Sequence, residues 1–557
     1  MNTRHDILPS SGIASDDKPE TDRAPASAAH TPTGNGRILP KLTPFWQDRC
    51  FEIGLILSMF LYYIVGNPGQ RILYFASISP FLNQLIALPF LLIFMVLCWY
   101  RLSIAIALLP LALPFYLQQR AVVGSISFSL AEVTLAVYLF IAALRLLLEN
   151  RDQLSWPPLR ERLGPFFWPI IVFCGAAALS ILMAYSRRFA IRAFHEEVVA
   201  PLLYLGLALL YLRTRQDLTR LLIALVGTGL LIALLGWGQF FLFWGAMAKI
   251  SGGHRLYAVY GSANSIGLLF DYVMPLAMAC LLARVATKSR LLALGTCILM
   301  VPVLILTFSG GAWMALSVAA LFVVALSLRN RRLLLLGSAL LVVVVAGGLL
   351  VFHTKVEQLL LGWHAAAPGD AGSIVKRFLL WESAWHMIQN SPWLGYGMDN
   401  WLCHYSVNSV CPNTLYHYWI LVNPANGQST GLASEPTLSH PHNIFLHVWV
   451  SMGIFGLLAF IVVLALFFRL FVRILKQLGS ANNEWSEQLR WMTVGVGAGM
   501  LAAVVQGMID SAFLEQDLAF CFWMLVTALL LLRIHAGVSW KSAISASQDQ
   551  ASAIPSE

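Results

Sequence analysis

Charged residues are scarce in this chain of 557 residues. Only 11% of its residues are Asp, Glu, Lys or Arg, whereas 58% are hydrophobic. A soluble domain of this composition would expose too much apolar surface to remain in solution, so the ordinary soluble classes are excluded. The composition indicates a protein that crosses a membrane many times.

Motifs that bind nucleotides or metals are also missing. The sequence contains no Gly-Lys-Ser/Thr of a phosphate-binding loop and no dinucleotide-binding fingerprint. It also lacks an Asp-x-Asp pair that could hold a divalent cation. We therefore expect no cofactor and no metal, so that any chemistry comes from side chains and from the substrate itself.

Long apolar runs occupy most of the chain, and each membrane span needs about 20 mostly apolar residues. The runs are 51–66, 80–100, 102–117, 127–148, 165–185, 197–212, 218–244, 265–284, 290–308, 311–328, 332–352, 442–470, 490–510 and 517–533. They are continuous, whereas the strands of a membrane barrel would alternate. Because some runs are short or adjoin, we expect an all-α polytopic membrane protein with about 12–14 transmembrane helices.

Two tails and one long loop separate these runs. Residues 1–45 and 536–557 are polar and aperiodic, as is typical of disordered tails. We expect transmembrane helices 1–11 in 46–352 and helices 12–14 in 442–535. The loop between them, 353–441, is the longest, and long loops in compact proteins are usually functional.

The net charge of +9 does not indicate nucleic-acid binding, because most of the 36 Lys and Arg residues fall on one side if both termini are cytoplasmic. This asymmetry fixes the orientation in the lipid bilayer and predicts that the large loop is periplasmic. The few basic residues left outside include Arg187, Arg188, Arg192, Arg255 and Arg377.

The large loop contains a predicted amphipathic helix at 374–390. Arg377, Trp381 and Trp385 recur every four residues there and share one face. Such a face suits a charged sugar carrier, since aromatic rings stack on sugars and Arg binds phosphate bidentately. Alternatively, the tryptophans lie at headgroup depth in an interfacial helix. Cys403 and Cys411 follow, and they are a disulfide candidate if the loop faces an oxidising compartment.

The segment "SHPHNIFLHVWVSMGIFG" (439–456) ends the loop. Pro441 predicts the start of a helix with His442 in its first turn. A neutral imidazole beside an anion bound at this helix end would be a general base. Gly453 and Gly456 would lie on the same face and let a neighbouring helix approach closely. Alternatively, His442 only caps the helix and the glycines serve packing.

Four acids on the outer side, Glu435, Asp510, Glu515 and Asp517, allow two interpretations. They could orient the histidine or position an acceptor. The more common role of such residues is that of solvated loop acids, and the sequence alone favours it.

Four stretches together resemble the O-antigen ligase superfamily, which includes O-antigen ligases, Wzy-type polymerases and bacterial protein O-oligosaccharyltransferases. "HNIFLHVWVSMGIFG" resembles its His-Asn, nine residues, Gly-x-x-Gly signature. "VYGSANSIGLLF" resembles the family stretch that leads from a glycine to an asparagine at the opening of a span. "KRFLLWESAWHMIQNSPWLGYGMDNW" resembles its Arg-x-x-x-Trp and Pro-x-x-Gly-x-Gly loop segment. "LTFSGGAWMAL" resembles its Ser-Arg-Gly turn, although Gly310 stands in place of the arginine.

The resemblance implies a GT-C-like helical bundle that transfers a glycan from undecaprenyl diphosphate, with inversion and without a metal. It implies that His442, with Asn443 beside it, is catalytic. It also implies that the diphosphate is bound by Arg255, by Arg377 and by arginines among Arg187, Arg188 and Arg192.

The acceptor is expected to be lipid A-core, as in a ligase of the bacterial inner membrane; another carrier-linked glycan, as in an O-antigen or exopolysaccharide polymerase, is the alternative. A transporter of polysaccharide or lipid is the rival from another class. It would predict internal repeats with broken helices at matching places, and no such repeat is visible in the sequence.

Overall fold

The computed structural model describes residues 44–67, 80–123, 126–148, 156–250, 253–327, 373–405, 411, 438–479 and 484–540. The chain divides into two units, Met1–Arg49 and Cys50–Glu557, and the candidate site belongs entirely to the second. Residues 1–43 and 541–557 of the two expected tails, the apolar run 332–352 and much of the large loop lie outside the described residues. The start of the second tail, 536–540, is described, and Nε1 of Trp540 donates to the carbonyl of Glu161 over 2.9 Å.

Helices dominate the described residues, as the apolar runs predicted. The longer helices are α1 (Pro44–Ile64), α2 (Pro80–Tyr100), α4 (Leu130–Leu148), α6 (Phe167–Ser180), α8 (Ala200–Tyr211), α9 (Arg215–Leu242), α10 (Ala263–Leu282), α11 (Thr287–Leu306), α12 (Gly310–Ser327), α15 (Ser373–Asn390), α17 (Ile444–Gly479), α18 (Glu484–Gly507) and α19 (Gln516–His535). Eleven helical segments in the described part of the chain are long and apolar enough to cross a membrane. The all-α polytopic membrane fold is therefore confirmed.

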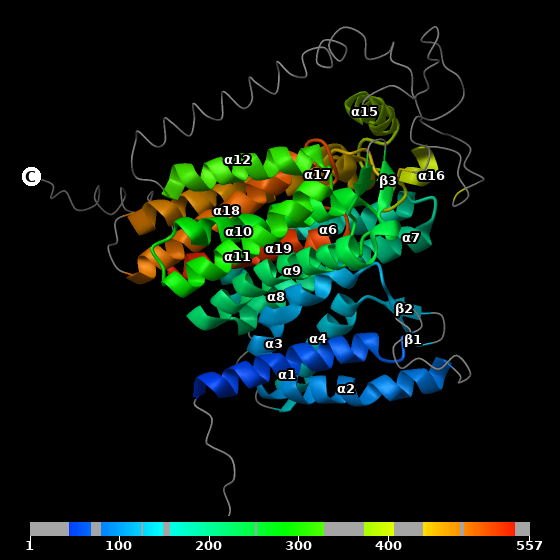
Figure 1. The fold of residues 1–557 in the computed structure, drawn as a ribbon. Helices are drawn as coiled ribbons and strands as arrows, with labels where there is room; N and C mark the ends of the chain where they lie inside the picture. The colour runs from blue at the N-terminus through cyan, green and yellow to red at the C-terminus, as the bar shows by residue number, and fades with distance from the viewer. Residues whose placement is uncertain are drawn as a thin grey trace, which may run out of the picture. The chain divides into compact units, whose positions relative to one another are not determined.

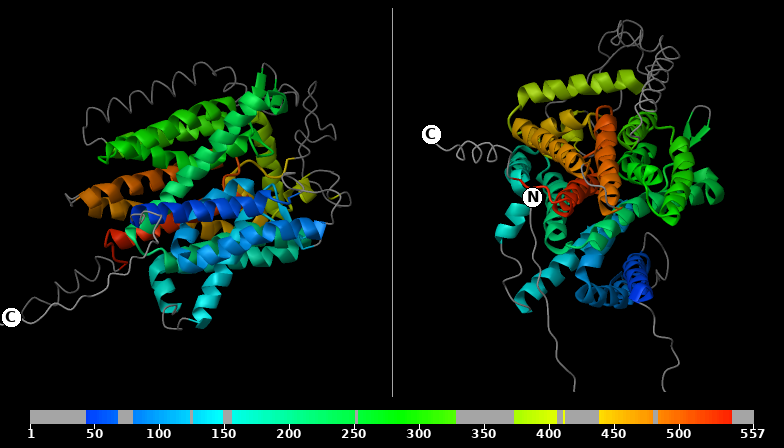
Figure 2. Two further views of the ribbon diagram at one scale, coloured as in Figure 1. Left: turned by 60° about the horizontal axis from the view of Figure 1, so that its bottom comes forward. Right: turned by 90° about the vertical axis from the view of Figure 1, so that its left-hand side faces the viewer.

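Shorter elements connect these helices. They are α3 (Leu102–Leu108), η1 (Leu109–Phe115), α5 (Trp156–Leu163), η3 (Gly164–Phe166), η4 (Ile181–Met183), α7 (Arg187–Ala193), the π-helix η5 (Phe194–Val199), η6 (Trp244–Ala246) and α16 (Trp401–Tyr405). Two antiparallel hairpins pair β1 (Arg120–Val123) with β2 (Ile126–Phe128) and β3 (Ala248–Ile250) with β4 (Gly253–Arg255). In Figure 1, α7, α15, α16 and the hairpins gather at one end of the long helices. The left-hand view of Figure 2 shows the α15–α16 segment at the same end.

Helix α19 is the most deeply buried of the long helices. Every residue from Gln516 to Arg533 is buried, and α8, α18, α10 and α17 all pack against it. Because its first turn carries the polar residues Gln516 and Asp517, polar groups reach the interior at the end of the bundle where α19 begins. Helix α17, which follows the large loop, packs against α6 and α18, and α15 packs on α17.

Helix α17 is broken at Gly453, which has φ 71° and ψ −173°. Glycine alone adopts this region readily. A loop docks in the break, where the N–H of Tyr396 donates to the carbonyl of Val450 over 2.7 Å. A Cβ atom at Gly453 would lie 1.9 Å from the carbonyl oxygen of Trp393. The prediction that Gly453 admits a neighbouring helix is therefore wrong, because the Pro-x-x-Gly-x-Gly loop occupies that place.

Candidate functional site

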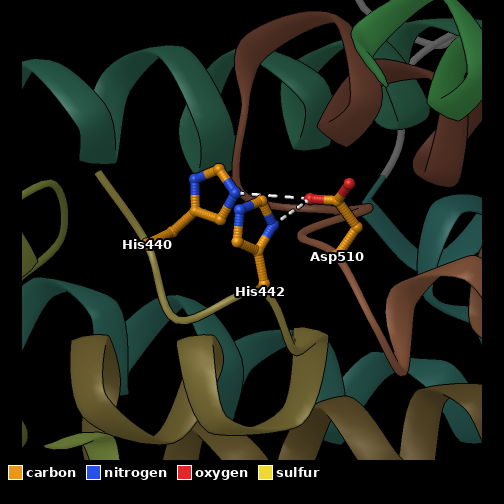
Figure 3. A group of neighbouring side chains, drawn as sticks. All are labelled: His440, His442 and Asp510. Atoms are coloured by element: carbon orange, nitrogen blue, oxygen red, sulfur yellow. Dashed lines mark hydrogen bonds and ion pairs between the residues drawn. The ribbon is translucent and has the colours of Figure 1, made fainter. Parts of the chain in front are cut away.

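The candidate site is built around a hydrogen bond between His442 and Asp510. Nδ1 of His442 lies 2.6 Å from Oδ1 of Asp510, and Figure 3 shows both the His442 and His440 rings turned toward this carboxylate. The Asp510 side chain is only 4% exposed, and that of His442 is 16% exposed. A histidine that donates Nδ1–H to a buried carboxylate has its other nitrogen, Nε2, free to accept a proton.

The backbone holds His442 in an unusual conformation just before α17. His442 has φ 51°, in the left-handed region that residues other than glycine seldom adopt. The helix begins at Ile444, so the prediction that His442 lies in its first turn is wrong. Strained residues of this kind concentrate at functional sites. The carbonyl of His442 accepts a hydrogen bond from Nε1 of Trp381 over 3.2 Å, which ties α15 to this turn.

Asn443 is the N-cap of α17. Its Oδ1 accepts hydrogen bonds from the N–H groups of Phe445 and Leu446, at 3.0 and 3.1 Å. Asn443 caps better than His442 would, because its short side chain reaches these free N–H groups. Its Nδ2 donates to the carbonyl of Met508, two residues before Asp510. Asn443 thus joins the helix that follows His442 to the segment that carries Asp510.

A second imidazole shares the same carboxylate. Nε2 of His440 lies 3.4 Å from Oδ1 of Asp510, and the His440 and His442 rings meet edge to face with centroids 4.7 Å apart. Burial alone would raise the pKa of the Asp510 carboxyl, but hydrogen bonds and charge from His440 and His442 hold it well below its ordinary value. Asp510 is therefore an anion at neutral pH, so the prediction that it is a solvated loop acid is wrong.

A chain of hydrogen bonds connects Asp510 to Arg255. Nδ2 of Asn264 donates to Oδ2 of Asp510 over 3.3 Å, and Oδ1 of Asn264 accepts from Nη2 of Arg255 over 2.7 Å. Nε of Arg255 donates to the carbonyl of Thr307 over 2.7 Å. Thr307 stands three residues before Gly310, where the family turn carries an arginine. Arg255 therefore places a positive charge beside the turn in which Gly310 replaces the family arginine.

Arg377 lies near the same carboxylate but has no hydrogen-bond or ion-pair partner among the described residues. Burial lowers the pKa of its guanidinium, and the negative charge of Asp510 partly opposes this effect. Arg377 remains charged at neutral pH because an arginine does not lose its proton in proteins. A partly buried cation without a partner is suited to bind an anion.

The three arginines of α7 behave differently from one another. Arg187 and Arg188 are exposed, and no described residue forms an ion pair or hydrogen bond with either side chain. Arg192 pairs with Glu196 over 2.8 Å. The turn before α7 is fixed to the large loop, since Asn400 accepts from the N–H of Ser186 over 2.7 Å. Arg187 and Arg188 are thus free for a ligand, whereas Arg192 is engaged.

The predicted helix 374–390 is confirmed as α15, but its two tryptophans differ. Trp381 is half-buried and bonded to the turn that carries His442. Trp385 is 48% exposed and contacts Trp449 edge to face, with centroids 6.0 Å apart. An exposed indole near the site can still stack on a sugar, whereas Trp381 is better placed to hold the turn. The structure pairs Cys403 with Cys411, the disulfide candidate of the large loop.

Two further acids lie beside the site rather than in solvent. Burial and the charge of Asp517 raise the pKa of Glu515 to about 7, and the hydroxyl of Tyr116 lies 3.3 Å from its Oε2. The Asp517 carboxylate accepts a hydrogen bond from Tyr260 over 3.0 Å. The interpretation of these residues as solvated acids is therefore wrong as well.

His440, His442 and Asp510 also form a group that could hold a metal ion, because their ligand atoms lie within 4.8 Å of one another. Nδ1 of His442 is, however, 2.6 Å from Oδ1 of Asp510. Two ligands of a tetrahedral zinc at 2.0–2.1 Å would stand roughly 3.3 Å apart. The observed spacing fits a shared proton better than a shared metal ion.

Comparison with known families agrees with the resemblance found in the sequence. Residues 295–461 match the family model described as O-Antigen ligase. This region includes Arg377, His442, Asn443 and Gly453 but not Asp510. No curated protein matches the chain. The match identifies an O-antigen ligase domain in this part of the chain, and it supports, in broad terms, a membrane enzyme of the O-antigen ligase and polymerase type.

Proposed function

Because the chain carries an O-antigen ligase domain, we propose that it is a glycosyltransferase of the bacterial inner membrane. It moves a glycan from undecaprenyl diphosphate to an acceptor hydroxyl on the periplasmic face, and both of its termini are cytoplasmic. The observation that carries the proposal is the 2.6 Å hydrogen bond from His442 to the buried Asp510. The charge of Asp510 acts on the guanidinium of Arg377, a cation without a hydrogen-bond or ion-pair partner among the described residues.

His442 is the general base in this proposal. Nε2 removes the proton of the acceptor hydroxyl as its oxygen attacks the anomeric carbon, and Asp510 stabilises the imidazolium that forms. General-base help of this kind is worth about 10²–10⁴ in rate. Asn443 and Trp381 are positioning residues, since they hold the backbone on either side of the imidazole.

The guanidinium groups bind the diphosphate that leaves. The bond from the anomeric carbon to the diphosphate oxygen breaks as the new glycosidic bond forms on the opposite face, which inverts the configuration. Arg377 and Arg255 stabilise the negative charge on the departing oxygens, and fixed charges of this kind often contribute more than proton transfer. The proposed reaction needs neither ATP nor a metal, because the carrier linkage already holds the energy.

We propose lipid A-core as the acceptor, as in a ligase. A polymerase would instead use another carrier-linked glycan, and deletion of the gene distinguishes the two. Intact polymer that is no longer attached to lipid A indicates a ligase. A single capped repeat indicates an O-antigen polymerase, and loss of an exopolysaccharide with unchanged lipopolysaccharide indicates an exopolysaccharide polymerase.

The proposal is tested with purified protein in detergent, carrier-linked glycan and acceptor, and no ion gradient. The wild type should form the new linkage, and His442→Ala should abolish it while remaining folded. His386→Ala is the matched control, because His386 is an exposed histidine of α15 with no place in the mechanism. Normal transfer by His442→Ala would remove the base assignment. Accumulation of unaltered glycan in vesicles by wild type would indicate a transporter.

A further inference from the structure

His440 contacts the buried carboxylate of the site, but the proposed reaction gives it no role. Its Nε2 lies 3.4 Å from Oδ1 of Asp510, and its Nδ1 lies 3.1 Å from Oγ of Ser439. The His440 side chain is only 12% exposed, and Figure 3 shows its ring turned inward to Asp510. An imidazole buried to this extent, with both nitrogens bonded, is held in one orientation.

These two hydrogen bonds fix which nitrogen of His440 carries the proton. An ionised carboxylate only accepts hydrogen bonds, so Nε2 of His440 is the donor toward Asp510. In a neutral imidazole the other nitrogen is an acceptor, and the Ser439 hydroxyl is the donor that Nδ1 then needs. His442 faces the same carboxylate oxygen with Nδ1 instead. The two histidines are therefore expected to be opposite tautomers.

Only His442 keeps a nitrogen available for an acceptor hydroxyl. Both nitrogens of His440 are engaged, one by Asp510 and one by Ser439. Nε2 of His442, in contrast, has no hydrogen-bond partner in the part of the chain that the structure describes. The contact from His440 to Asp510 is also the longer of the two imidazole contacts, at 3.4 Å against 2.6 Å. His440 is thus suited to support the base rather than to replace it.

The ring of His440 lies between two other histidine rings. It meets His442 edge to face and stacks on His447, with centroids 5.6 Å apart and an angle of 27° between the planes. Nδ1 of His447 lies 2.6 Å from Oγ of Ser511, and the N–H of Ser511 donates to Oδ1 of Asp510 over 2.9 Å. The contacts therefore form a closed ring that begins and ends at the carboxylate.

We propose that His440 is a positioning residue that holds the Asp510 carboxylate against Nδ1 of His442. Burial raises the pKa of the Asp510 carboxyl, and the hydrogen bond from His440 is the largest of the effects that lower it. Without this donor, a buried oxygen loses one partner and the carboxylate is less firmly oriented. The inference rests on the proposed function, because the orientation matters for catalysis only if His442 is the base.

Substitutions of His440 separate the hydrogen bond from the packing of the ring. His440→Gln places its amide nitrogen near the position of Nε2, so it can still donate to Asp510. His440→Phe keeps a flat ring between His442 and His447 but has no donor. His440→Asn carries the same amide as Gln on a side chain one methylene shorter, which does not reach Asp510. His386→Gln is the matched control, because His386 is an exposed histidine of α15.

The measurement is kcat and KM for the carrier-linked donor in detergent. We expect His440→Phe and His440→Asn to lower kcat about tenfold, as for the loss of one hydrogen bond to a charged group, with little change in KM. His440→Gln should recover most of this loss, and His386→Gln should behave as wild type. In Asp510→Asn protein, His440→Phe should cause no further loss, because His440 acts through Asp510.

Three results would overturn the assignment. They are full activity of His440→Phe, an equal loss in the Gln, Asn and Phe variants, and a change confined to KM. The first would show that the donor is not needed, the second that only the native ring serves, and the third that His440 binds the donor substrate. If His440→Phe does not fold, the Gln and Asn variants still give the same comparison.

A spectroscopic test does not depend on transfer. Chemical shifts of ¹⁵N in histidine rings distinguish a proton on Nδ1 from a proton on Nε2. The signals lost in His440→Phe should be those of an Nε2–H tautomer, and the signals lost in His442→Ala those of an Nδ1–H tautomer. An Nδ1–H tautomer at His440 would overturn the inference and leave the base assignment standing. Absence of transfer by wild type that shows both expected tautomers would instead refute the proposed function.

Discussion

Replacing Asp510 by Asn tests the central hydrogen bond, because the amide cannot satisfy all the donors around it. Oδ1 of Asp510 accepts from His442 and from the N–H of Ser511, and Oδ2 accepts from Nδ2 of Asn264. If the new NH₂ replaces Oδ1, it faces the Ser511 N–H and donates to Nδ1 of His442. If it replaces Oδ2, it faces the Asn264 amide nitrogen. Each orientation places a donor against a donor.

The first orientation has the larger consequence for catalysis. An NH₂ that donates to Nδ1 forces the proton of the imidazole onto Nε2. Nε2 then cannot remove the proton of the attacking hydroxyl. We therefore expect Asp510→Asn to lower kcat by about 10²–10⁴. KM for the carrier-linked donor should change little, because the arginines that we propose bind the diphosphate remain. Loss of the Asp510 charge should if anything strengthen the attraction of Arg377 for an anion.

The assay compares kcat and KM of Asp510→Asn, His442→Ala and the double variant in detergent with carrier-linked glycan. If the two residues act as one unit, the double variant should be no slower than His442→Ala alone. A kcat for Asp510→Asn within threefold of wild type, in protein that unfolds at the normal temperature, would refute the assignment. Additive losses in the double variant would show that Asp510 acts apart from His442.

Four further outcomes follow from the structure. Gly453→Ala should lower Tm and activity, because the backbone strain of about 1–3 kcal/mol adds to a clash of the new Cβ with the Trp393 carbonyl. Gly295→Ala in α11 is the control, since its added Cβ would meet no atom within 4 Å, and its Tm should be equal or higher. Arg377→Lys should recover only part of the carrier affinity that Arg377→Ala loses, as measured by KM, because lysine cannot bind bidentately. The raised pKa of Glu515, about 7 against an ordinary 4.5, means that the folded state holds this proton more tightly, so stability should fall as pH rises between these values; Glu515→Gln should flatten that decrease in Tm. EDTA should leave the rate of transfer unchanged, and a loss restored by Zn²⁺ would identify a metal enzyme.

The sequence predicted the features that depend on local composition. Apolar runs predicted the spans because each span must bury about 20 residues in hydrocarbon. The four-residue spacing of Arg377, Trp381 and Trp385 predicted α15, because that spacing places side chains on one helical face. The signature around His442 drew attention to an imidazole that the structure shows hydrogen-bonded to a buried carboxylate. Each of these signals lies within one short stretch of chain.

The missed features depend on contacts between distant segments. Asp510 lies on a turn between α18 and α19 and looks like any loop acid, and only the packing of α17 against α18 brings it to His442. The spacing of Gly453 from His442 predicts close packing of a neighbouring helix. The positive φ of Gly453 arises from a loop some sixty residues earlier, whose backbone fills the break. Helix α17 begins later than Pro441 suggested because Asn443 supplies a better cap.

The same contacts explain why the motifs that carry the family resemblance are scattered along the chain. The turn with His442 is fixed from three directions: by Trp381 of α15, by Asp510 after α18, and by Asn443 at the start of α17. Asn264 extends this arrangement to Arg255, which reaches the turn after α11. In the proposed reaction, the base at the acceptor hydroxyl and the cation at the departing diphosphate act on opposite sides of the anomeric carbon, so they have to be held at a fixed separation. A hydrogen-bonded chain from imidazole to guanidinium, anchored on four helices that pack together, provides that fixed separation in a loop-rich region of the molecule.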